Sequence, residues 1–175
     1  MGPSVFDQAV ATHHGEIHRY LRRATAQVSE ADDLSQETFL RAYRAWHRLP
    51  GDANVRAWLF AIATNLVRNH ARGESRRRRA YEEVRATRVE TAADGPEGIT
   101  IFNEARQLVE TVVSGLPLKQ RLAFVLRKVH DLDYDTIGAS LECSSDSARA
   151  HVFQALKKIR AGLNGHALPG MESQS

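Results

Sequence analysis

The apolar residues of this chain recur every three or four positions almost from end to end, and this spacing constrains the fold more than any other feature. Such a period places apolar side chains on one face of an amphipathic helix, whereas a half-buried strand would alternate with a period of two. No segment shows a convincing alternation of that kind. Apolar residues make up 42% of the chain, enough for a packed core. We therefore predict an all-α protein.

Helix start and stop signals divide this pattern into segments. We expect helices over about residues 5–26, from Ser29 as N-cap to about 48, from about 53 onward, from about 101 to 116, and from 118 after Pro117. Two further helices are expected at about 134–141 and 145–163. The residues expected to face inward in the first two helices are Val5, Ala9, Ile17, Leu21, Phe39, Ala42, Tyr43 and Trp46.

Between the helical stretches lies a segment of different composition. Residues 80–100 carry scattered acids, few large apolar residues and the turn sequence Asp94-Gly95-Pro96. We therefore predict two small helical domains, at residues 1–79 and 104–165, joined by a flexible linker at 80–103 and followed by a loose tail at 166–175. With such a linker, we expect the relative placement of the domains to depend on the partner.

Several classes of protein are disfavoured by what the sequence lacks. Cys143 is the single cysteine, so neither an internal disulfide nor a zinc site built on cysteines is expected. The eight histidines are scattered and form no H-E-x-x-H motif, and no nucleophile or carboxylate cluster stands out. There is no run of about 18 apolar residues and no signal-peptide pattern. We expect a cytoplasmic protein that is not an enzyme, with no catalytic residues, no metal, no cofactor and no membrane insertion.

The last two helices predict a helix-turn-helix, because a tight turn at 142–144 separates a short helix from a longer, polar one. In this motif the second helix enters the major groove of DNA. Its candidate contact residues offer hydrogen bonds to bases or phosphates, or a small apolar surface: Ser145, Ser147, Arg149, Ala150, His151, Gln154, Lys157 and Lys158. The alternative is an ordinary helical hairpin with a solvated polar face.

The first half carries two further polar faces. One lies opposite the apolar face of the second helix and comprises Asp33, Gln36, Glu37, Leu40 and Arg44; it is either a docking surface for a basic partner or simply solvated. The other comprises Asn65, Arg68, Asn69 and Arg72 and leads into four consecutive arginines at 76–79. This arginine density favours phosphate binding. Together with the polar loop before Trp58 (Gly51, Asp52, Asn54 and Arg56), it is suited to holding unstacked single-stranded bases. The alternatives are that Trp58 is core and that the arginines only aid solubility.

Four stretches resemble the extracytoplasmic-function (ECF) sigma factors of bacterial RNA polymerase. ADDLSQETFLRAYRAW at 31–46 and VRAWLFAIATNLVRN at 55–69 resemble region 2. LPLKQRLAF at 116–124 and DYDTIG at 133–138 resemble region 4. The resemblance covers about residues 5–72 and 104–163 in the family's order, with its linker between, and no extra C-terminal domain is expected.

The resemblance implies a sigma factor that binds core RNA polymerase and directs promoter-specific transcription initiation. It implies docking on the β′ clamp helices and the β flap, promoter DNA as a second partner and an anti-sigma factor as a third. The expected polymerase-binding residues are Asp32, Asp33, Gln36, Glu37, Leu40, Arg41 and Arg44. The residues expected to melt and hold the −10 element are Asp52, Asn54, Arg56, Trp58, Asn65, Arg68, Asn69, Arg72, Arg76 and Arg77. The candidate contact residues of the helix-turn-helix would read the −35 element.

Three positions depart from the family's usual pattern. Glu142 stands where a glycine is common at the turn, Gly138 replaces an alanine, and Ala148 replaces a valine. A left-handed conformation at Glu142 would cost about 1 kcal/mol relative to glycine. The main alternative function is a helix-turn-helix regulator that acts without core polymerase, although such a regulator would leave the polar faces of the first half unexplained.

Overall fold

The computed structural model describes residues 4–84 and 101–165, and within these ranges the chain is helical without strands. The elements are α1 (Val5–Ala24), α2 (Val28–Ala45), the 3-10 helix η1 (Trp46–Arg48), α3 (Val55–Val84), α4 (Ile101–Ser114), α5 (Leu118–Lys128), α6 (Tyr134–Leu141) and α7 (Ser145–Gly165). The all-α prediction is therefore confirmed. The predicted linker lies mostly outside the described residues, as does the predicted tail.

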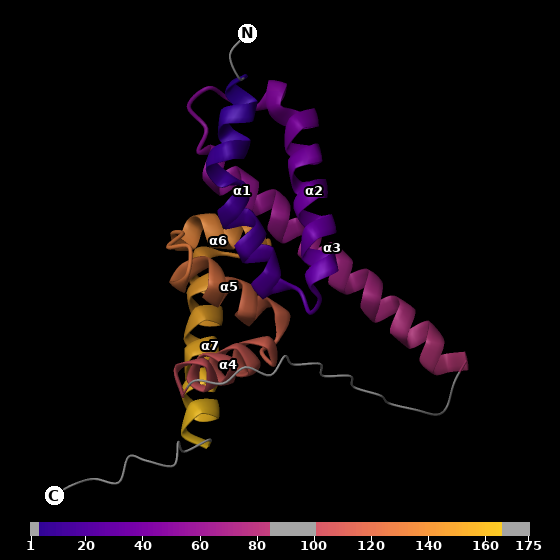
Figure 1. Cartoon of the computed structure of the whole chain (residues 1–175), viewed down its shortest axis with the longest axis vertical. Coiled ribbons are helices and arrows are strands. Elements are labelled where there is room, and N and C mark those ends of the chain that lie inside the picture. Colours follow the sequence, from indigo (N-terminus) through magenta and orange to yellow (C-terminus); the bar gives the residue numbers. More distant parts are fainter. Residues whose placement is uncertain (1–3, 85–100, 166–175) are drawn as a thin grey trace, which may run out of the picture.

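The first half is built from α1, α2 and the N-terminal part of α3, which pack against one another (Figure 1). A capping box starts α1: the Ser4 hydroxyl accepts the amide hydrogen of Asp7, and the Asp7 carboxylate accepts that of Ser4. Fully buried Ile17, Tyr20 and Leu21 of α1 meet Leu59 and Phe60 of α3. A reciprocal cap and a large buried face thus hold α1 in place.

Three expectations for this half were wrong. Helix α2 begins at Val28 with Gln27 as N-cap, so Ser29 already lies inside the first turn and does not cap the helix. Val5 is 70% exposed, because at 100° per residue it lies about 120° around the helix from Ile17. Tyr43 is 65% exposed, because Ala42 occupies the buried face and Tyr43 is turned about 100° away from it.

The second half is built from α4 to α7, with α5 and α6 both packed on α7. Helix α5 starts directly after Pro117, as predicted. The centre of this half is formed by fully buried Leu122 and Leu126 of α5 and Ile137 and Leu141 of α6. The sequence period predicts Ala148, Val152, Ala155, Leu156, Ile159 and Leu163 as the inward residues of α7. Ala148, Val152, Ala155 and Ile159 are buried, and Leu156 and Leu163 are half-buried. Helix α4 crosses the C-terminal part of α7.

The two halves contact each other rather than standing apart. Helix α6 packs on α3, and α5 packs on α1. The His130 side chain, at the end of α5, lies edge-on to Tyr20 and inclined to Phe60, with ring centroids 5.8 and 4.9 Å away. Buried residues of both halves therefore form one hydrophobic cluster. The C-terminal part of α3 projects away from this body (Figure 1).

Candidate nucleic-acid and partner interfaces

The turn between α6 and α7 is a tight left-handed turn centred on Glu142, which has φ 52° and ψ 53°. The Cys143 amide donates to the Gly138 carbonyl at 2.9 Å, closing the turn. A side chain at Gly138 would bring its Cβ within 2.7 Å of the Cys143 carbonyl oxygen, so this turn requires glycine there. The Ser144 hydroxyl then accepts the Ser147 amide hydrogen at 3.1 Å and caps α7. Two departures from the family pattern, Glu142 and Gly138, are thus parts of one turn.

The outward face of α7 presents the residues predicted to contact DNA. Arg149, Ala150, Gln154, Lys157 and Lys158 are exposed, and Ser145, Ser147 and His151 are half-buried. Phe153 lies within this group and is 65% exposed, yet sequence reasoning passed over it. The signal was present, since Phe153 lies three residues after Ala150 and four after Arg149. The face therefore combines hydrogen-bond donors with an apolar ring.

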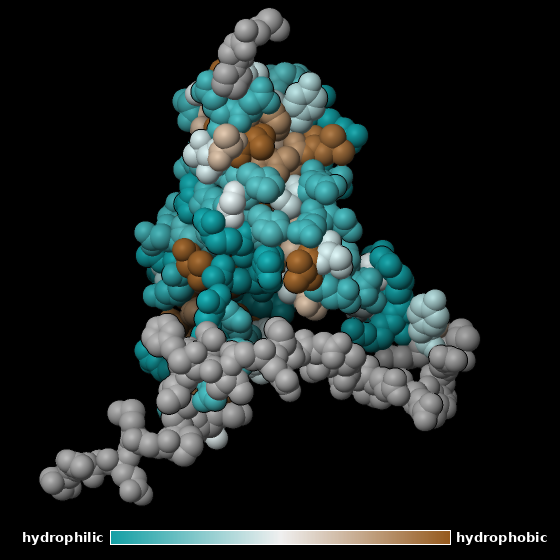
Figure 2. Space-filling model, in the orientation of Figure 1, coloured by the Kyte–Doolittle hydropathy of each residue, from teal (hydrophilic) through white to brown (hydrophobic). Residues whose placement is uncertain are grey.

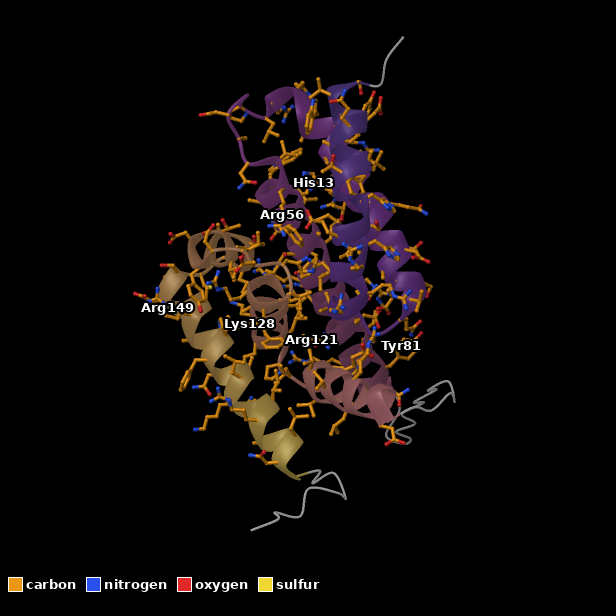
Figure 3. All side chains as sticks on the ribbon, turned by 60° about the vertical axis from the view of Figure 1, so that its left-hand side comes forward. His13, Arg56, Tyr81, Arg121, Lys128 and Arg149 are labelled. Carbon is orange, nitrogen blue, oxygen red and sulfur yellow. The ribbon has the colours of Figure 1, made fainter. Side chains whose placement is uncertain are left out.

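The N-terminal end of this face is braced by stacking. The Arg149 guanidinium lies over the Tyr134 ring, 5.0 Å from its centroid, and Arg127 lies at the same distance. Arg149 is also 3.5 Å from the Asp146 carboxylate. Arg149 nevertheless remains exposed at the outer surface, as Figure 3 shows. Burial lowers the pKa of His151, with a smaller contribution from Lys119, which favours the neutral imidazole.

The polar face of α3 divides into an inner and an outer part. Arg68 is only 5% exposed, and Asn65 beside it is half-buried. Asn69, Arg72, Arg76 and Arg77 are exposed along the projecting part of the helix. Sequence periodicity placed Asn65, Arg68, Asn69 and Arg72 on one polar face that leads into the arginine run, but it could not show that the end of α6 contacts Arg68.

The loop before α3 supplies the remaining candidates. Asp52 and Asn54 are exposed, and the Asn54 side chain accepts the Ala57 amide hydrogen at 3.0 Å, so it also caps α3. Trp58 is half-buried and packs against the core with its ring centroid 6.0 Å from that of Trp46. Trp58 thus has a packing role, in line with the alternative considered from the sequence.

Arg56 is half-buried, and its guanidinium is engaged by other parts of the chain. Its Nε donates to both carboxylate oxygens of Glu16 at 3.0 Å, and its Nη2 donates to the His130 carbonyl at 2.7 Å. His13 contacts the same carboxylate at 2.8 Å, and Figure 3 shows His13 and Arg56 close together. Burial alone would raise the pKa of Glu16, but the hydrogen bonds from Arg56 and His13 outweigh it and hold that pKa below its ordinary value.

The outer face of α2 carries the predicted docking residues. Asp32, Asp33, Gln36, Leu40, Arg41 and Arg44 are exposed and Glu37 is half-buried. Glu37 pairs with Arg41 at 2.6 Å, and Asp32 contacts His18 of α1 at 2.7 Å. The misassigned Tyr43 adds an exposed ring near the 43%-exposed Leu40. Figure 2 shows apolar surface over the upper parts of α1 and α2, within a largely polar surround.

Comparison with known proteins gives these surfaces a common context. Residues 9–77 match the family model for Sigma-70 region 2, and residues 106–159 match that for Sigma-70, region 4. The ECF RNA polymerase sigma-E factor of Escherichia coli (strain K12) is 30% identical over 157 residues, which cover 82% of each chain. This chain belongs to the ECF sigma factors. It is therefore a transcription-initiation factor that directs promoter-specific transcription, as its resemblance to regions 2 and 4 implied.

Other proteins resemble this sigma factor over most of its length. The RNA polymerase sigma-H factor of Pseudomonas aeruginosa is 30% identical over 168 residues, covering 90% of this chain and 86% of that protein. The fold is similar to the sigma factor RpoE of Bartonella quintana, solved with the anti-sigma factor NepR, with a TM-score of 0.71, 22% identity and coverage of 91% and 96%. It is also similar to CnrH, solved with the cytosolic domain of CnrY, with a TM-score of 0.64, 23% identity and coverage of 91% and 88%.

Within the described parts of the chain, this sigma factor has no group of three or more metal-binding side chains. None of the helices described combines the length and the apolar character needed to cross a membrane. Cys143 is unpaired by any disulfide and half-buried at the turn.

Proposed function

We propose that the two halves of this sigma factor divide promoter recognition between them while α2 holds the polymerase. The observation that carries the proposal is that one chain displays a charged and apolar face on α2, an arginine-bearing face on α3 and a helix-turn-helix with an outward polar face on α7. A regulator acting without polymerase would use only the last of these.

The polymerase-binding surface is the outer face of α2, formed by the residues expected from the resemblance together with Tyr43. Leu40 and Tyr43 are exposed at the centre of this surface, and burial of their apolar side chains against the polymerase stabilises the complex. The surrounding charges orient the partner. The expected partner elements are the β′ clamp helices, with the β flap binding the second half.

The −10 surface is formed by the loop at 50–54 and the polar face of α3. Exposed Arg72, Arg76 and Arg77 attract the phosphate backbone, and Asn65 and Asn69 are suited to hydrogen bonding with the edges of unstacked bases. Because half-buried Trp58 packs against the core, its contribution is to fix the start of α3 beside the loop.

The −35 surface is the outward face of α7. Gln154 is suited to adenine and Arg149 to guanine in the major groove, while Lys157 and Lys158 reach phosphates. Phe153 offers an apolar contact for a thymine methyl group.

An anti-sigma protein is the expected regulator, since RpoE and CnrH were both solved with binding partners and the first of these partners is named as an anti-sigma factor. A factor that works with polymerase belongs in the cytoplasm. No catalytic role is expected for this chain, since the polymerase supplies the chemistry.

The test is run-off transcription from a randomised promoter library with core polymerase, with and without this protein, beside duplex binding by the protein alone. Specific transcripts that need both components support the proposal. Tight, specific duplex binding without any gain in polymerase selectivity would replace it with the regulator alternative.

A matched pair of variants on α2 tests the docking surface. Leu40→Asp places a charge at the centre of that surface and should abolish binding to core polymerase. Val28→Asp places the same charge on the same helix at a 54%-exposed apolar position outside it, and should leave binding intact. Equal effects of the two variants would argue against this docking site.

A further inference from the structure

Arg68 of α3 is a positive charge buried between the two halves of the chain. Its Nη2 donates to the Glu142 carboxylate at 2.7 Å, and its Nη1 donates to the Asn65 side chain at 3.2 Å and to the Ser140 carbonyl at 3.4 Å. Its side chain is 5% exposed, whereas that of Glu142 is 63% exposed. Arg68 belongs to the polar face of α3, but its guanidinium is bound by the end of α6 and by the turn of the helix-turn-helix.

Glu142 has a left-handed backbone conformation, which is unfavourable for glutamate. It is one of two non-glycine residues with positive φ among those described, both at 52°. Glycine adopts this conformation without steric cost, and glutamate does not. The Glu142 carboxylate recovers stability by pairing with Arg68, and the hydrogen bond from Arg68 lowers its pKa below the ordinary value. The glutamate at this turn is thus explained by a contact to the other half of the chain.

The same contact occupies part of the −10 surface. Arg68 and Asn65 both belong to that surface in the proposed function. Arg68 bonds to the Ser140 carbonyl of α6, and the Asn65 side chain accepts a hydrogen bond from Arg68. The Arg68 guanidinium, paired with the Glu142 carboxylate in a side chain that is only 5% exposed, is closed off from a nucleic-acid phosphate. Arg56, a third member of the surface, is tied to the His130 carbonyl across the same junction. Closing of the halves and binding of single-stranded DNA at these residues therefore exclude each other.

We propose that the Arg68–Glu142 ion pair is an autoinhibitory latch, which closes the second half onto the −10 surface of the free chain until core polymerase separates the halves. This proposal rests on the proposed function for the identity of the masked surface. Linkage then requires that anything that weakens the latch strengthens single-stranded DNA binding by the free protein, because a larger fraction of the chain is competent to bind.

The chain offers a matched control at its other left-handed residue. Asp131 has the same φ of 52° and pairs with Arg127 at 3.3 Å, but this pair lies wholly within the second half. Glu142→Gly and Asp131→Gly each relieve a left-handed backbone and each remove one carboxylate from an arginine. Only the first removes a contact between the halves. Glu142→Gln keeps the side-chain shape and the left-handed turn residue but removes the charge. It therefore distinguishes the effect of losing the ion pair from the effect of changing the turn.

The first measurement is the distance between the halves in the free protein. Spin labels at Ser29→Cys and Arg160→Cys, both exposed, are placed in a Cys143→Ser background and read by pulsed electron resonance. We expect one short, narrow distribution for the parent and for Asp131→Gly, and a broad distribution reaching longer distances for Glu142→Gly and Glu142→Gln. Identical distributions for all four proteins would overturn the latch.

The second measurement is the affinity of each free protein for fluorescein-labelled, random-sequence single-stranded DNA. Both Glu142 variants should bind at least about threefold more tightly than the parent, with Asp131→Gly unchanged. Opening of the halves without tighter binding would overturn masking by the latch. Run-off transcription by the parent with core polymerase is measured separately. Its absence would overturn the proposed function and with it the masked surface, whereas failure of the latch alone leaves that transcription intact.

Discussion

Arg56 and His130 are 74 residues apart in the sequence, and the Arg56 Nη2 donates to the His130 carbonyl at 2.7 Å, joining α3 to the end of α5. The same guanidinium holds the Glu16 carboxylate of α1. One arginine thus links three segments of the chain at the junction of its two halves.

Replacing Arg56 should destabilise this junction. Arg56→Ala leaves the Glu16 carboxylate, 18% exposed, without its main partner, and we expect a loss of about 1–3 kcal/mol in the free energy of unfolding. Urea melts would measure it. Arg41→Ala removes the Glu37–Arg41 ion pair on the surface of α2, in which the Arg41 side chain is 50% exposed. It should change the free energy of unfolding by less than about 0.5 kcal/mol. Equal losses would show that Arg56 contributes no more than a surface pair.

The pH dependence of Arg56→Ala should also differ in sign. In the parent, the pKa of Glu16 is below its ordinary value, so its contribution to stability is present above the unfolded pKa and is lost as pH falls through the folded one. Without Arg56, only His13 remains to oppose the effect of burial, so we expect the pKa of Glu16 to rise above its ordinary value and ionised Glu16 to destabilise the fold. Melting curves of the parent and the variant from acid to neutral pH would test this reversal.

His130 should make the fold sensitive to acid. It is 6% exposed, and burial, only partly offset by Glu16, lowers its pKa to about 4. The folded chain therefore binds fewer protons than the unfolded one between that value and the ordinary His pKa, and stability should fall as pH decreases through this window. His130→Leu should flatten that part of the curve. An unchanged slope would mean that His130 is already charged in the fold.

Tyr20 and Thr64 supply a buried hydrogen bond between α1 and α3. Their hydroxyl oxygens are 2.8 Å apart, and both side chains are fully buried. Tyr20→Phe should cost about 1–2 kcal/mol because the Thr64 hydroxyl loses its partner. Adding Thr64→Val should recover part of that loss, since no orphaned hydroxyl remains. Additive losses in this double-mutant cycle would contradict coupling between the two hydroxyls.

The turn of the helix-turn-helix should reject a side chain at Gly138. Gly138→Ala would place Cβ within 2.7 Å of a backbone carbonyl, and we expect about 1–3 kcal/mol of destabilisation with weaker −35 binding. Gly51→Ala meets no atom within 4 Å and should be neutral or slightly stabilising. Thermal melts of both variants provide the comparison.

Sequence periodicity was sufficient for local structure and for most of the core. It placed Ile17 and Leu21 inward because the helical period fixes which side chains share a face. It misplaced Tyr43 because aromatic residues at the edge of an apolar stripe look the same whether or not a neighbour covers them. The position of the helix-turn-helix followed in the same way from local signals.

The contacts between the halves were not accessible from the sequence. Arg68 was correctly grouped with a polar face, but its burial depends on α6, which follows it by about 70 residues and carries no pattern that names its partner. The sequence marks Glu142 as unusual at the turn, but it does not explain why a glutamate stands there. The explanation is the ion pair between the Glu142 carboxylate and Arg68. Tertiary packing decides such cases, and local periodicity does not encode it.

The central claim, that the two halves read separate promoter elements, is tested most directly by selecting promoters with core polymerase and either the parent or Gln154→Arg. Gln154 is exposed on α7, and arginine prefers guanine where glutamine prefers adenine. We predict that the selected −35 sequence changes toward guanine at one position while the −10 sequence stays the same. A change in the −10 element, or an unchanged −35 element, would contradict the claim.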